Sequence, residues 1–191
     1  MTETKVEKNV YSGVSNLLGN KTLEQVMQSE FDKLGPVIFD ESDKVFANEI
    51  RSTLTEADIL DSFQRIGIEA PLDMPLCDFV APLESIGNGG IGSTDMGDVS
   101  WVVPTVQARI ATCAVGTPFH TWQTVAQGKA PAAHKGMIHA AKIMASTASA
   151  LIRDPRKLKE AKDIYNAHVS KNPYICPIPE EVSPPVINNK V

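Results

Sequence analysis

The sequence has few cysteines and no long apolar run. It contains only Cys77, Cys113 and Cys176, an odd number without a Cys-x-x-Cys pair, which argues against a disulfide framework or a structural zinc knuckle. No apolar run approaches the length that crosses a bilayer. The first eight residues are polar and hold no hydrophobic signal core. We therefore expect a protein of the reducing cytoplasm that makes no contact with a membrane.

Positive charge is also scarce. The 191 residues carry 18 Lys and Arg against 23 Asp and Glu, a net charge of −5, whereas a nucleic-acid or anionic-membrane binder needs clustered cations. We expect no nucleic-acid partner. Hydrophobic residues make up 42% and charged residues 21%, as in an ordinary soluble globular protein. The length suits one domain, or one domain plus part of another.

Helical periodicity accounts for much of the chain. Thr22 is expected to cap the first helix, because Gln25 three residues later completes a capping-box pattern. Thr55 is expected to cap the third helix, and Asp154-Pro155 has the form of an N-cap followed by proline at the first helical position. Apolar spacing predicts helices over residues 22–34, 41–54, 55–66, 131–153 and 155–169.

Two segments show strand-like alternation, residues 5–11 and 105–116. Between them, residues 67–92 are rich in Pro and Gly and predict a long loop, either functional or a plain surface insertion. Residues 171–191 hold many prolines and predict an extended tail. Two strands cannot make a complete sheet, so we expect an α/β chain with helices packed on a partial sheet, belonging to something larger.

One polar cluster, Gly92–Asp98, is a candidate site. It contains Asp95 and Asp98 in an Asp-x-x-Asp pattern. One interpretation is the amino terminus of a helix, where such residues cap free N–H groups and offset the helix dipole. The other is a loop that presents carboxylates to a metal or to a metal-bound water. The pattern alone is weak and leaves both open.

A second cluster, Gly116–Trp122, places His120 just after the expected strand. Binding sites of α/β folds form at such strand ends, and neutral imidazole is a common metal ligand. A histidine bonded to turn backbone is the alternative, because a metal site needs three or more ligands and no second histidine lies at ligand spacing. His134, beside Lys135 in the first turn of the expected helix, could line the same pocket.

These clusters carry a resemblance to a known family. The chain resembles amidohydrolases of the aminobenzoyl-glutamate hydrolase type, within the zinc/manganese-dependent aminoacylase and carboxypeptidase superfamily. Proteins of this kind have a catalytic α/β domain interrupted by a small α+β dimerisation domain. The segments that carry the resemblance are Gly92–Trp101, Val115–Gln123 and Ala133–Met137, with further similarity over Tyr174–Pro179 and Met1–Glu7.

The resemblance implies a domain plan for a carboxy-terminal part of such a protein. Residues 1–19 would end the small dimerisation domain with its last strand. Residues 20–170 would form the carboxy-terminal half of a three-layer catalytic domain, and residues 171–191 a Pro-rich tail. The chain would then hydrolyse an N-acyl amino acid, such as aminobenzoyl-glutamate, only together with a missing amino-terminal half or a homologous subunit, and a homo-oligomer is expected.

The resemblance also implies site residues. His120 corresponds to the metal-ligand position contributed by the carboxy-terminal half, in a family that binds two divalent ions, Mn or Zn. Gly116 and Thr117 would offer backbone N–H groups to a substrate carboxylate, and Asp95, Asp98 and His134 would line the site. The other ligands and the general-base glutamate have no counterpart, so the chain alone is expected to be inactive. The alternative is a non-catalytic protein that complements or regulates a homologous hydrolase.

Overall fold

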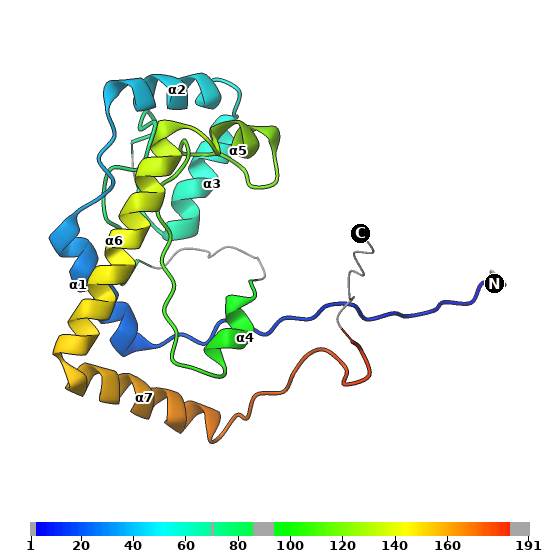
Figure 1. Ribbon diagram of the computed structural model, residues 1–191. Coiled ribbons are helices and arrows are strands. Elements are labelled where there is room, and N and C mark those ends of the chain that lie inside the picture. The colour runs from blue at the N-terminus through cyan, green and yellow to red at the C-terminus, as the bar shows by residue number, and fades with distance from the viewer. Residues whose placement is uncertain (1–2, 70, 86–93, 184–191) are drawn as a thin grey trace, which may run out of the picture.

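The structure, a computed structural model, describes residues 3–69, 71–85 and 94–183 (Figure 1). All regular secondary structure in these ranges is helical. The helices are α1 (Lys21–Leu34), α2 (Glu41–Arg51), α3 (Glu56–Ile66), α4 (Met96–Ser100), α5 (Trp122–Gln127), α6 (Pro131–Arg153) and α7 (Pro155–Val169).

The long helix α6 is the centre of the arrangement. It packs against α1 and α7, which also contact each other. Ile143 of α6 is 1% exposed and Ala161 of α7 is fully buried. Towards the other end of α6, Ala132 joins a buried apolar cluster with residues of α2 and of two connecting segments. That cluster consists of Ala47, Ile50, Leu76, Ala114 and Ala132.

Local sequence signals account for the ends of the helices. Asp40 and Thr55 begin α2 and α3 with complete capping boxes, and Pro131 and Pro155 occupy the first positions of α6 and α7. The predicted bounds of α6 and α7 are confirmed. Thr22 is not the cap of α1, however. Asn20 accepts from the Leu23 N–H and also donates to the Ala161 carbonyl, so it fixes α1 to α7.

The α/β prediction is wrong for the described chain. No strand or sheet occurs in residues 3–69, 71–85 and 94–183, so there is no three-layer domain with helices on a sheet. Residues 5–11 carry no regular structure, and most of their side chains are exposed. Alternation makes a chain extended, but a strand exists only when a neighbour pairs with its backbone.

The strand expected over residues 105–116 is also absent, and residues 105–113 show why. From 106 to 110 the side chains alternate as expected: Val106, Ala108 and Ile110 are partly buried, whereas Gln107 and Arg109 are exposed. Beyond them the alternation fails, because residue 111 is partly buried and residue 112 is exposed. The segment runs beside α6 in Figure 1. Within the described ranges, however, its backbone N–H groups form no hydrogen bond. The pattern therefore predicted how the side chains of residues 106–110 divide between two faces, and it was wrong about the strand.

No helix in the described part of the chain combines the length and apolar character needed to span a membrane. Two short helices were absent from the sequence prediction, α5 altogether and α4 as a definite element. Helices of five and six residues show too little periodicity to be recognised.

Candidate functional site

His120 lies in a braced turn of residues 116–121, the His120 turn, just before α5. Its side chain is exposed, and its φ of 63° is the only positive φ of a non-glycine residue in the described ranges. The left-handed conformation costs a residue with a Cβ roughly 1–2 kcal/mol. Such strain persists where the surroundings impose it, and it concentrates at functional positions.

Hydrogen bonds to neighbouring residues impose the shape of the turn. The Pro118 carbonyl accepts from the hydroxyl groups of both Thr121 and Thr124, each at 2.7 Å. Gln127 is buried; its Oε1 accepts from the Ala114 N–H at 2.7 Å, and its Nε2 donates to Thr117 Oγ1 at 3.1 Å. Sequence reasoning missed Gln127, because a glutamine in a short unpredicted helix carries no recognisable signal.

Gly116 holds the other side of the turn. Its φ is 93°, and a Cβ built on it would lie 2.8 Å from Ile59 Cγ1 and 3.1 Å from Ile59 Cα. Glycine is therefore required here both by conformation and by the close approach of α3. Thr117 is engaged within the turn, because its hydroxyl donates to the Ala114 carbonyl at 2.6 Å.

Asp98 connects three parts of the chain that are distant in sequence: its own helix α4, the segment at Ser15 and the segment at Tyr174. Its Oδ1 accepts from the Ser15 hydroxyl at 2.8 Å and from the Tyr174 hydroxyl at 2.9 Å. The next residues continue the junction: Ser100 Oγ accepts from the Leu18 N–H, and the Trp101 indole N–H donates to the Asn16 carbonyl. We call this the Asp98 junction. Its geometry identifies Asp98 as a structural link between the two ends of the described chain.

The Asp98 junction shifts the pKa values of both its acidic groups. The hydrogen bond from Ser15 holds the pKa of Asp98 below its ordinary value of 3.8. The hydrogen bond to Asp98 raises the pKa of Tyr174 from 10.0 to about 12. Ionised Asp98 and neutral Tyr174 are therefore the forms that the folded junction favours.

A pH dependence follows. Because folding lowers the pKa of Asp98, the ionised carboxylate stabilises the folded protein above pH 3.8, and this stabilisation is lost as pH falls below that value. Because folding raises the pKa of Tyr174, the neutral phenol stabilises the folded protein below pH 10.0, and this stabilisation is lost as pH rises towards about 12.

In a background of Trp122→Phe and His168→Phe, which removes the imidazole packed on Trp101, the Trp101 fluorescence should be flat between these limits and change at both. Tyr174→Phe should reduce the alkaline change and leave the acidic one intact, because Tyr165 still bonds the Trp101 carbonyl. An unaltered alkaline change would contradict the assignment.

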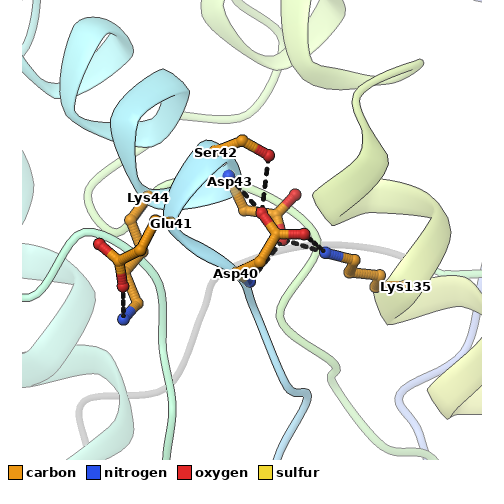
Figure 2. Close-up of polar contacts among 6 residues, drawn as sticks. All are labelled: Asp40, Glu41, Ser42, Asp43, Lys44 and Lys135. Carbon is orange, nitrogen blue, oxygen red and sulfur yellow. Dashed lines mark hydrogen bonds and ion pairs between the residues drawn. The ribbon is translucent and has the colours of Figure 1, made fainter.

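Lys135, in the first turns of α6, binds two carboxylates at the start of α2 (Figure 2). Its ammonium lies 2.6 Å from Asp40 Oδ2 and also contacts Asp43 Oδ2. The hydrogen bond from Lys135 holds the pKa of Asp40 well below its ordinary value. The Asp43 side chain is fully buried, whereas that of Asp40 is 59% exposed, so the ion pair between the two helices is buried only at Asp43. No local pattern indicates this ion pair, because Lys135 lies 92 residues beyond Asp43.

An apolar cavity of about 410 Å³ lies between two extended segments and three helices. Residues 77–81 and 109–113 line it from the connecting segments, and α1, α3 and α6 line it with Phe31, Phe63 and His139. The Nε2 of His139 is buried and has no hydrogen-bond partner among the described residues. Burial raises the pKa of the two thiols that line the cavity, Cys77 and Cys113.

The structure does not assemble the predicted site residues into one place. Asp95 is exposed at the start of α4, which Figure 1 shows well apart from α5 and the His120 turn. His134 is exposed in the first turn of α6. Gly92 and Ser93 lie outside the described residues. Within the described ranges, no three His, Cys, Asp or Glu side chains form a group that could hold a metal ion.

Comparison with known proteins yields one relative of note. The chain is 38% identical, over 96% of its own length, to the p-aminobenzoyl-glutamate hydrolase subunit designated B, from Escherichia coli (strain K12). The match spans 40% of that relative. The resemblance expected from the sequence motifs is thus confirmed, and it concerns part of the larger protein. No protein-family model and no solved structure matches the chain.

Proposed function

We propose that this chain is one part of a metal-dependent amidohydrolase that cleaves an N-acyl amino acid such as aminobenzoyl-glutamate. The observation that carries the proposal is the 38% identity along 96% of the chain to a protein named as a hydrolase of that substrate. Similarity that covers nearly the whole chain supports a shared role better than a match at one motif would.

His120 is the residue that we propose as a metal ligand of the complete enzyme. Its exposed position and its strained backbone support a functional role, because backbone strain of this kind concentrates at functional positions. Imidazole is a favourable ligand for Zn, whereas Mn prefers carboxylate and carbonyl oxygens and would draw most of its ligands from them.

Gly116, in the His120 turn, is proposed to contact the substrate, and exposed Asp95 and His134 are proposed to lie around the assembled site. The N–H and the hydroxyl of Thr117 are both bonded to the Ala114 carbonyl, and Asp98 is held in its junction, so neither is retained as a site residue.

The residues described do not fit a complete two-metal centre by themselves. In the described part of the chain, no group of three potential ligands exists, whereas a two-metal site needs several ligands fixed around both ions. We therefore assign His120 one ligand position and no catalytic step. The other ligands would come from a polypeptide equivalent to the part of the relative outside the match.

A second candidate is a non-catalytic protein that complements or regulates a homologous hydrolase. It is favoured by the name of the relative, which describes one subunit of an enzyme. In that case binding of the chain would change the activity of a partner that already holds all of its metal ligands.

The test is a reconstitution assay. The chain alone with Mn or Zn should not hydrolyse aminobenzoyl-glutamate, because one histidine does not hold two ions. Mixing it with a polypeptide equivalent to the unmatched part of the E. coli relative should produce chelator-sensitive hydrolysis. In that mixture His120→Asn, which tolerates the left-handed backbone, should lower metal occupancy and rate together by about tenfold or more.

His168→Phe is the matched control. His168 packs edge-on against Trp101 with ring centroids 5.4 Å apart, and phenylalanine keeps an aromatic ring at that position. It should leave metal occupancy and rate unchanged. Metal-dependent turnover by the chain alone, or full metal occupancy in His120→Asn, would overturn the ligand assignment. A partner that hydrolyses fully on its own, with its rate altered by the chain, would instead establish the regulatory role.

A further inference from the structure

Gln127, the last residue of α5, is a polar side chain whose hydrogen bonds all lie inside the protein. Its residue is 3% exposed, and both side-chain polar atoms are bonded. Its Oε1 accepts from the Ala114 N–H at 2.7 Å, while its Nε2 donates to Thr117 Oγ1 at 3.1 Å and to the Gln123 carbonyl at 3.0 Å. Burying a glutamine costs desolvation and side-chain entropy, so its role follows from the groups that it joins.

These bonds attach α5 to the segment just before the His120 turn. Both backbone polar groups of Ala114 are engaged, its N–H by Gln127 and its carbonyl by Thr117. The hydroxyl of Thr117 has one hydrogen, which it donates to the Ala114 carbonyl, so its lone pairs accept from Gln127. Every donor in this set meets an acceptor. The turn is thereby closed between two fixed ends, residues 114–117 on one side and α5 on the other.

The backbone of His120, inside this closed turn, is unfavourable on its own. A residue with a Cβ keeps a left-handed φ such as its 63° only where the surroundings impose it. The close approach of Gly116 to Ile59 restricts the start of the turn, and the hydroxyls bonded to the Pro118 carbonyl restrict its middle. Gln127 adds the link from the start of the turn to the helix that follows His120.

We propose that Gln127 is a positioning residue for His120: it holds the turn in the shape that places the imidazole for metal binding, and it contacts neither metal nor substrate. This rests on the proposed function, which makes His120 a metal ligand. A ligand that is already held in place loses less freedom when it binds. Residues that orient a metal ligand in this way typically contribute about 10–100-fold to metal affinity.

The first experiment measures the backbone of His120 in the chain alone, through the NMR coupling between its Cα and Hα nuclei, which differs between positive and negative φ. Gln127→Leu keeps a side chain of similar size and removes its three hydrogen bonds. In this variant His120 should leave the left-handed conformation, while the amide shifts in the middle of α6 stay as in the parent. A positive φ retained in folded Gln127→Leu would overturn the proposal.

Gln123→Leu is the matched control. It makes the same change four residues earlier in α5, where the side chain bonds Thr53 Oγ1 at 3.4 Å, and it keeps the carbonyl that Gln127 uses. It should leave His120 left-handed; a shift as large as that in Gln127→Leu would assign the effect to α5 as a whole and refute the specific role. Thr117→Val breaks the link from the other side. If Gln127→Leu does not fold, a left-handed His120 in Thr117→Val would overturn the proposal.

The second experiment uses the reconstituted mixture. Gln127→Leu should weaken metal binding by about tenfold or more, and added metal should restore the rate because the imidazole is still present. In a His120→Asn background the same substitution should cause no further loss of metal affinity, since it acts through that histidine. A loss of equal size in both backgrounds would show a structural effect unconnected with His120 and would sink the proposal.

The two experiments distinguish this role from the proposed function. Metal binding that depends on His120, together with a parent-like His120 backbone in Gln127→Leu, would overturn the role of Gln127 alone. A His120 backbone that depends on Gln127, in a mixture whose metal binding is unchanged by His120→Asn, would uphold the hold of Gln127 on the turn and overturn the proposed function.

Discussion

Replacing Gly97 with alanine should destabilise the protein by about 2 kcal/mol or more, although alanine is the better helix former. A Cβ at this position would lie 1.9 Å from the Ser15 carbonyl oxygen, which belongs to backbone and cannot rotate away. The residues 15–18 would have to move off α4. Chemical denaturation should show the loss, and amide exchange should accelerate at Ser15 and Leu18, whose N–H groups bond Asp98 and Ser100.

Gly128→Ala is the control for the helix-propensity effect. Gly128 ends α5 with a φ of −60°, and a Cβ there would meet the Val125 carbonyl oxygen at an ordinary 3.5 Å. Its stability should stay within about 0.5 kcal/mol of the parent. If the two alanine variants were equally stable, the close packing of α4 on residues 15–18 would be refuted.

Lys135→Met should lower the melting temperature by roughly 5 °C or more. Methionine preserves most of the apolar stem but removes the ammonium that serves Asp40 and Asp43 (Figure 2). The Asp43 side chain is fully buried, so its carboxylate would be left without a cation. A buried charge deprived of its partner is far more costly than the intact pair is stabilising.

Lys44→Met on α2 provides the comparison. Lys44 pairs with Glu41 at 2.8 Å, but both side chains are substantially exposed, and such pairs contribute little. Its melting temperature should remain close to that of the parent. In the Lys135→Met background, Asp43→Asn should recover part of the loss because the buried group is then neutral. Failure of this compensation would show that Lys135 acts through packing alone.

The helices were predictable because their signals are local. Asp40, Thr55 and Asp154-Pro155 begin helices through contacts within four residues of themselves. Asn20 illustrates the limit. It displaces the expected Thr22 cap because its amide also reaches the Ala161 carbonyl, a contact across 141 positions that no local pattern encodes.

The prediction of a sheet was wrong because a sheet depends on pairing between distant segments, which local patterns do not encode. Alternation reports how side chains divide between two faces, and that division is present over residues 106–110. Whether such a segment becomes a strand depends on a partner backbone, which the described chain does not offer. The candidate site shows the same contrast between local features, which the sequence predicts, and distant contacts, which it does not. Gly116 and Pro118 shape the turn at His120, whereas the groups that would share a metal with it cannot be read from its neighbours.

The Asp98 junction also bears on how the protein is made. Residues 15–18 are synthesised first, Asp98 follows Ser15 by 83 positions, and Tyr174 follows Asp98 by a further 76. At about 5–20 residues per second, the first segment would wait several seconds for α4 and several more for Tyr174. The emergence of Tyr174 therefore sets the earliest moment at which all three segments of the junction can be joined.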